Sequence, residues 1–152
     1  MKNLITPTLL IIFILMFNSP RLYAQTEKMT PEILWDLGRV SLDHLNNNQA
    51  IYGVTNYDLK KNKGNRELYL ADLNTGVHTQ LTNSPENEHS SFLIKGGNSY
   101  VFIKKGQLYI SNTKQIKSEK AKKLTSFKTK IQSAKITELN DGRILLVFST
   151  RV

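Results

Sequence analysis

The 152-residue sequence contains no cysteine, only four prolines and a single tryptophan. The missing thiols exclude disulfide bonds, thiolate catalysis and cysteine-ligated metals. Helical periodicity is also missing after about residue 40, which argues against a βαβ architecture. We therefore expect a β-rich fold held together by packing alone.

Acidic residues are scarce, with 12 Asp and Glu against 21 Lys and Arg, for a net charge of +9. The lysines gather in the polar segments 60–63 and 114–123, among Asn, Ser and Gln. Aromatic residues of the kind that stack on bases are not interleaved with them. The sequence therefore predicts solvated loops and no nucleic-acid partner.

The longest apolar segment lies at the amino terminus, from Leu4 to Phe17. It follows Lys2 and is itself followed by Leu22-Tyr23-Ala24, the layout of a secretory signal peptide. Its 14 residues fall short of the roughly 20 needed to span a bilayer. We expect residues 1–24 to be a signal peptide, residues 25–152 to be periplasmic or secreted, and no stable membrane anchor. An uncleaved anchor is the alternative.

A short helical segment is predicted within residues 25–40. Thr30 can cap its amino end, and Pro31 fits the first helical position. Gly38 can end the helix in the left-handed conformation. Ile33, Leu34 and Leu37 would form an apolar face that packs on the following segment, since so short a helix is unstable alone.

Two phrases of the sequence occur twice. Leu68-Tyr69-Leu70 precedes Gln80-Leu81-Thr82, and Leu108-Tyr109-Ile110 precedes Lys123-Leu124-Thr125. The offsets are 40 residues for the first phrase and 43 for the second. A period of about 40–45 residues filled with short strands is typical of β-propeller blades.

Alternating and β-branched segments predict the strands of these repeats. We expect strands at 50–57, 67–73, 77–82, 91–94, 99–104 and 107–112, and a third unit at 131–139 and 143–150. The predicted class is all-β, a partial propeller of about two to three antiparallel blades over residues 41–152. Since propellers have roughly four to eight blades, we expect an incomplete propeller, from a longer protein or a truncated gene product, with the apolar strand 144–148 exposed. A self-contained β-sandwich is the alternative.

Three further segments resemble exported serine peptidases of the prolyl oligopeptidase family, in its dipeptidyl-peptidase and acylaminoacyl-peptidase-like branch. They are Met29–Ser41, Ile51–Asp58 followed by Asn62–Tyr69, and Gln80–Glu86, and the resemblance covers roughly residues 29–110. Family blades usually carry a Ser-Pro-Asp-Gly turn, and the corresponding places here read Leu42–Asn48 and Ile94–Asn98. The signature is eroded at both.

The resemblance implies an amino-terminal propeller that covers an α/β-hydrolase domain and restricts the access of peptides. In that family the catalytic Ser, Asp and His belong to the hydrolase domain. We therefore expect a propeller fragment that is inactive alone and meets a peptide substrate only if the catalytic domain is supplied. The alternative is a non-enzymatic periplasmic module that binds a protein partner through an exposed blade edge.

The residues themselves offer little catalytic chemistry. A nucleophile elbow needs Gly-x-Ser-x-Gly, and Gly97-Asn98-Ser99 is followed by Val101 where the second glycine would stand. His44, His78 and His89 lack ligand spacing and are expected on the surface or in turns. No catalytic residue, metal site or cofactor is predicted, and the substrate-binding residues stay unassigned.

Overall fold

The computed structural model describes residues 28–114 and 121–150. The predicted signal peptide lies outside these residues. Within them, no helix is both long and apolar enough to cross a membrane. The described chain has a single α-helix, α2 (Pro31–Asp36), followed by ten strands in three antiparallel sheets.

Each sheet is built from strands that follow one another in the chain, as in a meander. Sheet 1 contains β1 (Arg39–Leu45), β2 (Gln49–Asp58), β3 (Lys63–Asp72) and β4 (His78–Gln80). Sheet 2 contains β5 (Glu88–Ile94), β6 (Ser99–Lys104), β7 (Gln107–Asn112) and β8 (Lys122–Lys123), with a 3₁₀ turn, η1 (Lys95–Gly97), between β5 and β6. Sheet 3 contains β9 (Ile131–Glu138) and β10 (Ile144–Thr150).

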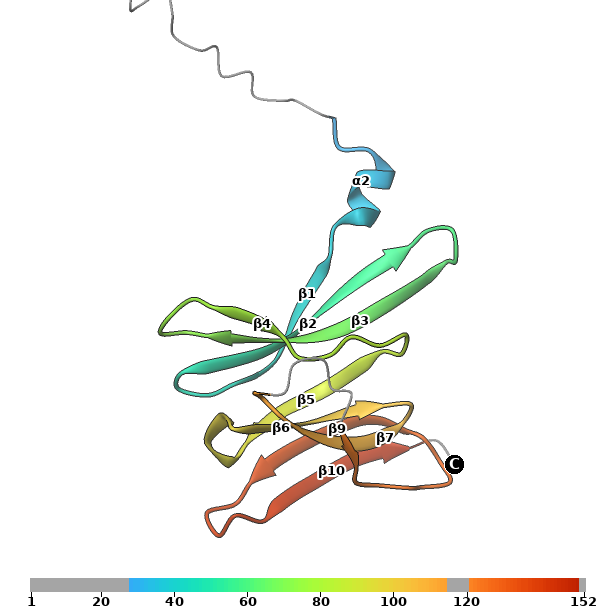
Figure 1. Ribbon diagram of the computed structural model, residues 1–152. Helices are drawn as coiled ribbons and strands as arrows, with labels where there is room; N and C mark the ends of the chain where they lie inside the picture. Colours follow the sequence, from blue (N-terminus) through green and yellow to red (C-terminus); the bar gives the residue numbers. More distant parts are fainter. Residues whose placement is uncertain (1–27, 115–120, 151–152) are drawn as a thin grey trace, which may run out of the picture.

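The sheets lie side by side as successive layers, with sheet 2 in the middle (Figure 1). Their first strands contact one another in sequence, β1 with β5 and β5 with β9. The described residues do not close into a ring. The predicted all-β architecture of antiparallel meanders is confirmed, and its layering resembles that of propeller blades.

The strand that completes sheet 1 is β1, which lies before residue 50. The sequence patterns predicted only the three strands that follow it, at 50–57, 67–73 and 77–82. β1 begins at Arg39. The turn expected over Leu42–Asn48 is shorter, Asn46–Asn48, because Leu42, His44 and Leu45 pair with β2. Asn46 closes this turn by accepting hydrogen bonds from the backbone N–H groups of Asn48 and Gln49 through its Oδ1.

Helix α2 begins as predicted but ends and packs differently. Thr30 Oγ1 accepts a hydrogen bond from Ile33 N at 3.3 Å, and Pro31 is the first helical residue. The predicted glycine stop is wrong, because Leu37 already has extended backbone and Gly38 does not adopt a positive φ.

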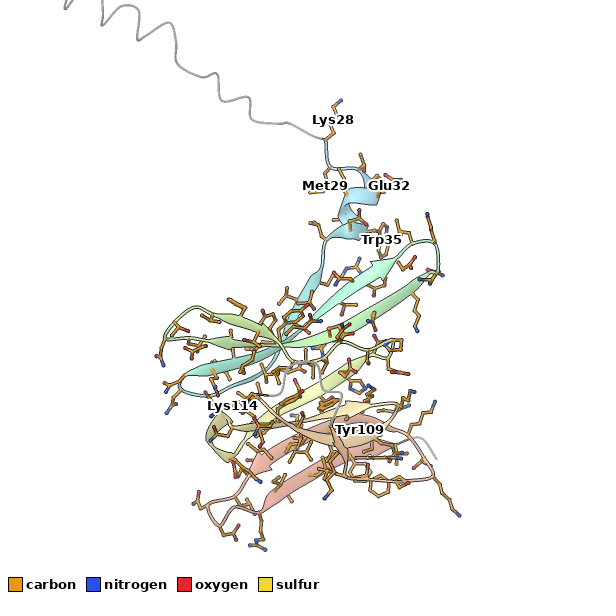
Figure 2. All side chains as sticks on the ribbon, viewed as in Figure 1. Lys28, Met29, Glu32, Trp35, Tyr109 and Lys114 are labelled. Atoms are coloured by element: carbon orange, nitrogen blue, oxygen red, sulfur yellow. The ribbon has the colours of Figure 1, made fainter. Side chains whose placement is uncertain are left out.

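The expected packing of the helix's apolar face is also wrong. No residue of α2 is buried, and Leu34 and Leu37 are half exposed. The helix contacts β2 through Trp35, whose ring centre lies 5.4 Å from that of Tyr57, and the guanidinium of Arg39 lies 4.6 Å and 4.4 Å from these two ring centres. Figure 2 shows Glu32 on this helix and Met29 just before it, away from the layered sheets.

Two apolar cores fill the two junctions between the sheets. The first junction, between sheets 1 and 2, buries Ile51, Leu68, Leu81, Leu93, Tyr100 and Phe102. The second junction, between sheets 2 and 3, buries Ile94, Val101, Ile103, Leu108, Ile131 and Ile136. Strand β6 serves both cores, because successive side chains of a strand point to opposite faces.

The repeated phrases of the sequence correspond to a repeated hydrogen-bonded bracket. In sheet 1, Glu67 accepts a hydrogen bond from Thr82 Oγ1 at 2.6 Å and another from Ser84 N at 2.8 Å. Thr82 Oγ1 in turn accepts from Leu68 N at 2.8 Å. The threonine of Leu-Thr thus ties the end of the fourth strand to the third strand.

Sheet 2 repeats this bracket with a neutral side chain. Gln107 Oε1 accepts from Thr125 Oγ1 at 2.9 Å and from Phe127 N at 3.0 Å. Thr125 Oγ1 accepts from Leu108 N at 2.9 Å. The offsets of 40 and 43 residues therefore mark equivalent positions in two equivalent sheets, and the first residue of the motif is Glu or Gln.

Strand β10 is exposed at four of the five residues 144–148, as expected, with Ile144 39% and Phe148 40% exposed. Leu145 and Val147 are 51% and 62% exposed. Leu146 instead packs on the second core, and the Phe148 ring stacks on that of Phe127 with centroids 5.2 Å apart. One face of sheet 3 is therefore only partly covered, around Leu146, and its other face is open.

Candidate functional site

A cavity of about 550 Å³ lies where the first strands of the three sheets come together. Its lining is Leu42, Asp43, His44, Arg66, His89, Ser90, Ser91, Phe92, Ala134, Lys135 and Ile136. Residues far apart in the sequence thus meet here, from β1, β3, β5 and β9. Propeller-like layering brings first strands together, so this cavity is our candidate site.

Two β-bulges aim polar side chains into this region. The pairing of β1 with β2 shifts register between Leu42 and His44, which leaves Asp43 outside the ladder. The pairing of β5 with β6 shifts between His89 and Phe92, and Ser90 there has a positive φ of 52°. Bulges re-aim side chains in this way, and here they bring Asp43 to Ser91.

Asp43 and Arg66 form an ion pair that is nearly buried. Arg66 Nη2 lies 2.7 Å from Asp43 Oδ1, and the two side chains are 13% and 11% exposed. Ser91 donates to Asp43 Oδ2 through its N at 2.9 Å and its Oγ at 2.6 Å. Arg66 Nη1 also donates to Glu88 O at 2.7 Å. The pair therefore links sheet 1 to sheet 2, and losing one partner would leave a buried charge uncompensated.

Gly53 makes room for this arginine. The guanidinium of Arg66 lies across Gly53, in the space that a Cβ atom would occupy. A side chain at position 53 would displace Arg66 from Asp43. The glycine inside strand β2 is thus explained by a close approach of a side chain.

Two of the three histidines lie at the cavity, contrary to their expected surface or turn positions. His44 stacks on Phe92 with ring centroids 3.7 Å apart, and burial lowers its pKa. His89 lies 3.1 Å from Ser90 Oγ through Nδ1, and burial, followed by the nearby charge of Arg66, lowers its pKa. His78 alone is exposed, and its Nδ1 is 2.8 Å from the Tyr52 hydroxyl.

These contacts do not form a serine–histidine–acid relay among the described residues. The Asp43 oxygens receive Arg66 and Ser91, whereas His89 contacts Ser90. A relay requires the acid to orient the histidine that activates the serine. The arrangement instead offers hydrogen-bonding and charged groups around a cavity. Within the described ranges, no cluster of three or more His, Asp or Glu residues could hold a metal ion.

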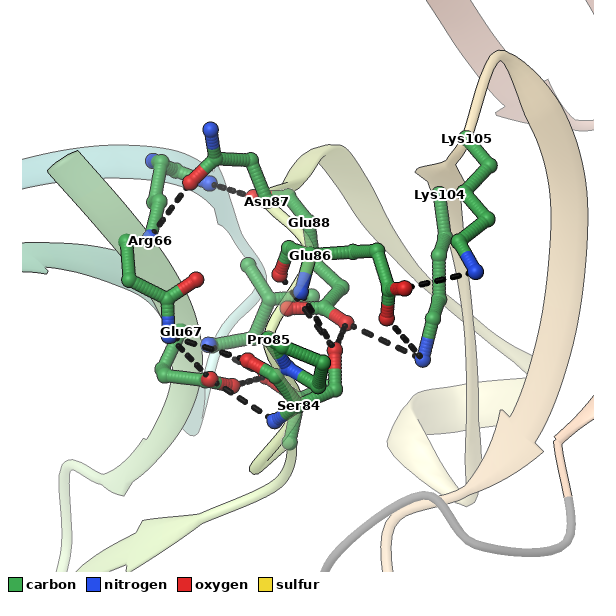
Figure 3. Close-up of polar contacts among 12 residues, drawn as sticks. Arg66, Glu67, Ser84, Pro85, Glu86, Asn87, Glu88, Lys104 and Lys105 are labelled. Atoms are coloured by element: carbon green, nitrogen blue, oxygen red, sulfur yellow. Dashed lines mark hydrogen bonds and ion pairs between the residues drawn. The ribbon is translucent and has the colours of Figure 1, made fainter. Parts of the chain in front are cut away.

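A second polar cluster closes the first junction beside the cavity (Figure 3). Glu88 has no exposed surface, accepts from Ser84 Oγ at 2.6 Å through Oε1, and lies 3.5 Å from Lys104 Nζ. Burial, opposed by the Ser84 hydrogen bond and reinforced by the charge of Glu67, raises the pKa of Glu88 to about 7. Glu88 is therefore a buried group whose charge changes near neutral pH.

The outer rim of this cluster consists of an ion pair and a hydrogen bond near the surface. Glu86 pairs with Lys105 at 2.6 Å, which lowers the pKa of Glu86. Asn87 Oδ1 accepts a hydrogen bond from Arg66 N at 2.7 Å, as Figure 3 shows. The residues between 84 and 88 thus connect the two sheets through side chains as well as through the backbone.

Sequence reasoning missed Asp43, Arg66, Ser91 and Glu88 as a connected set. The sequence did contain one indication of this set, namely charged residues inside otherwise apolar strands. Such residues are generally paired when they are buried. The partners could not be named, because they lie 22 to 48 residues apart in the chain.

The arrangement defines a class of protein, an all-β chain with blade-like sheets grouped around a polar cavity. A comparison with solved structures gives the same class. The chain is similar to an acylaminoacyl peptidase of Pyrococcus horikoshii, with a TM-score of 0.53 and 18% identity. The similarity covers 67% of this chain and 16% of that one, and it concerns the fold.

Sequence comparison adds a particular relationship. The chain is 33% identical over 79 residues to dipeptidyl-peptidase 5 of Porphyromonas gingivalis. The match covers 51% of this chain and 12% of that protein, and no family model matches the chain. Together these similarities confirm the predicted relationship to prolyl oligopeptidase-family peptidases, of which the chain spans only a fragment.

Proposed function

We propose that this chain is a partial β-propeller of two to three blades from an exported peptidase of the prolyl oligopeptidase type. Sheets 1, 2 and 3 are the blades, and the cavity lined by their first strands lies on the side of the propeller axis. The supporting observation is the adjacency of β1, β5 and β9 around a polar cavity, in a fold similar to that of a peptidase.

In this role the chain contacts peptides without cleaving them. The cavity supplies groups that bind a peptide, namely the Asp43–Arg66 pair, Ser91 and two mainly uncharged histidines. It supplies no activated nucleophile among the described residues. A catalytic domain of the family would carry out hydrolysis, with the propeller limiting which peptides reach it.

An activity assay tests the proposed lack of peptide hydrolysis by this chain alone. The purified chain is incubated with chromogenic dipeptidyl and acylaminoacyl substrates, beside a complete family peptidase as the positive control. We expect no hydrolysis above the buffer rate. Turnover that copurifies with the chain and is lost in a Ser91→Ala variant would contradict the proposed role.

Export is tested separately, by amino-terminal sequencing of the chain recovered from a bacterial periplasmic fraction. Removal of residues 1–24 predicts that the mature protein begins at Gln25. Recovery of the chain only in the membrane fraction, still beginning with Met1, would favour the uncleaved anchor.

One observation favours a second candidate, a non-enzymatic protein-binding module. Sheets 1 and 2 have four strands, whereas sheet 3 has two in the described chain, with β10 at its margin. A sheet margin can accept an extended strand from a partner. A synthetic strand peptide that protects the β10 amides from hydrogen exchange, and not those of β2, would favour this candidate.

A further inference from the structure

Each sheet begins with a strand that has only one neighbour, namely β1, β5 and β9 (Figure 1). The candidate cavity is lined by consecutive residues of each of these strands, at 42–44, 89–92 and 134–136. Successive side chains of a strand point to opposite faces, so a cavity that touches consecutive residues lies along the edge of the strand. The unpaired backbone edges of the three strands therefore border this cavity.

The edge of β5 is already occupied by side chains of sheet 1. Ser91 N donates a hydrogen bond to Asp43 Oδ2 at 2.9 Å. Leu93 N donates to His44 Nδ1 at 3.4 Å. Two outward N–H groups of β5 are thus satisfied without a further strand.

The edge of β9 has no such cover. Leu139 N donates to Arg143 O at 2.7 Å, so these two residues form a hydrogen-bonded pair of the β9–β10 hairpin. Hydrogen-bonded and non-hydrogen-bonded pairs alternate along an antiparallel ladder. Counting back from Leu139, Ala134 and Ile136 fall in non-hydrogen-bonded pairs. Their N–H and C=O groups therefore point away from β10, toward the cavity.

These four backbone groups have no protein partner within residues 28–114 and 121–150. They belong to alternate residues of an extended strand, which is the spacing with which one strand hydrogen-bonds another. The opening does not depend on where sheet 3 ends, because in sheets 1 and 2 the later strands are added beyond the second strand, on the side away from the first. The β9 edge is thus open because β9 is the first strand of its sheet.

We propose that the cavity binds a short peptide in extended form, as an added strand on the β9 edge, through the N–H and C=O groups of Ala134 and Ile136. This inference rests on the proposed peptide-binding role and names the groups that carry it out. The cavity volume of about 550 Å³ limits the bound segment to a few residues. Main-chain hydrogen bonds give affinity in this mode, and alternate side chains of the added strand give specificity. Leu42 and Phe92 line the same cavity, so we expect apolar side chains to be preferred over charged ones.

Fluorescence anisotropy tests the pairing with a defined probe. Fluorescein-labelled Val-Thr-Val-Thr-Val-amide is titrated with the purified full chain. The matched control peptide has the same sequence with an N-methyl group on each internal amide, so it keeps the side chains and lacks the donors. We expect the control to bind about tenfold more weakly or worse.

A proline at position 134 tests the edge from the side of the protein. Ala134→Pro removes one outward N–H group and leaves the β9–β10 ladder intact, because edge strands accept proline where the N–H points away from the sheet. It should weaken binding of the probe about tenfold or more. Ala134→Ser keeps the N–H group and is expected to keep the wild-type affinity. Circular dichroism verifies that both variants are folded.

Hydrogen exchange of the wild-type chain, followed by NMR, needs no variant. The bound probe should slow exchange of the Ala134 and Ile136 amides. The amides of Leu146 and Phe148 lie in the same non-hydrogen-bonded pairs but point to the free edge of β10. Their exchange should be unchanged.

The outcomes separate this inference from the proposed function. Binding that neither N-methylation nor Ala134→Pro weakens would overturn the strand pairing and leave the peptide-binding role standing. Protection of Leu146 and Phe148 in place of Ala134 and Ile136 would overturn it by moving the peptide to β10. No binding of the probe up to about 1 mM would contradict both the pairing and the role.

Discussion

The two junctions both pack one sheet on the next, but they are filled by different kinds of side chain. The second junction is almost wholly aliphatic, around Val101, Ile103 and Leu108. The first junction combines an aromatic core with buried charges, because Glu67 and Glu88 lie beside it. Where sheet 2 has Gln107 in its bracket, sheet 1 has Glu67. The difference shows that one hydrogen-bond pattern can be made with a carboxylate or with a neutral amide.

The largest expected effect comes from the aromatic core of the first junction. Phe102 is fully buried and stacks on both Tyr100 and Tyr109. Phe102→Ala should lower the free energy of unfolding by about 3–5 kcal/mol, through lost burial and the cavity left behind. Urea denaturation measures the change. Ile103→Val, at the adjacent position that faces the second junction, should cost only about 0.5–1.5 kcal/mol.

The next largest effect separates the two brackets. Thr82→Val removes the hydroxyl that donates to Glu67, and Thr125→Val removes the one that donates to Gln107. We expect a loss of about 1.5–3 kcal/mol for Thr82→Val and about 0.5–1.5 kcal/mol for Thr125→Val, since hydrogen bonds to charged groups are worth more. Equal losses in urea melts would show that the charge of the first bracket adds nothing.

The pH dependence of stability should arise at Glu88. Its pKa is raised from 4.5 to about 7 in the folded protein. Between these values the folded state binds the proton more tightly than the unfolded state, so this contribution to stability is complete below pH 4.5 and is lost as the pH rises through 7. We expect the free energy of unfolding to fall by about 1–2 kcal/mol from pH 5 to pH 8 through this group.

Glu88→Gln should flatten that dependence, because the amide keeps an acceptor for Ser84 and cannot ionise. Urea melts at pH 5, 6, 7 and 8 measure it. The groups facing Glu88 are Ser84 and Glu86 from the connecting segment, Glu67 from β3, and Lys104 and Tyr100 from β6. A variant with the full wild-type pH slope would place the titrating group elsewhere.

The smallest effect is expected at the rim of the first junction. Lys105 pairs with Glu86, but its side chain is 63% exposed. Exposed pairs contribute little because water and salt screen them. Lys105→Ala should therefore leave the thermal midpoint unchanged within error, which differential scanning fluorimetry measures. A clear decrease would mean that the rim contributes as much as the buried cluster.

Sequence patterns predicted the strands well, because alternation and turn residues are local signals. The hairpin β6–β7 was placed correctly across Lys105-Gly106, where both residues have positive φ. The capping threonine of α2 was also predicted. The packing of α2 was not predicted correctly. The helical spacing of Ile33, Leu34 and Leu37 shows that they share a face, but not whether another part of the protein packs on that face.

The candidate site could not be predicted in the same way. Asp43 and the segment around Ser90 lie at bulges, and a bulge is decided by how two strands pair rather than by either strand alone. His44 and His89 were expected at the surface, since a histidine on a strand gives no sign of which face is covered. The pairing of Asp43 with Arg66 and Ser91 depends on two sheets being stacked.

The amino-acid sequence by itself determined the repeat, the strands and the relationship to peptidases of the prolyl oligopeptidase family. These depend on short-range patterns, such as the Glu/Gln-Leu-Tyr and Leu-Thr phrases that close each bracket. Only the tertiary structure decided which charges are buried, where the cavity lies and which faces stay open. Those properties come from the stacking of one sheet on another, which joins residues that no local pattern connects.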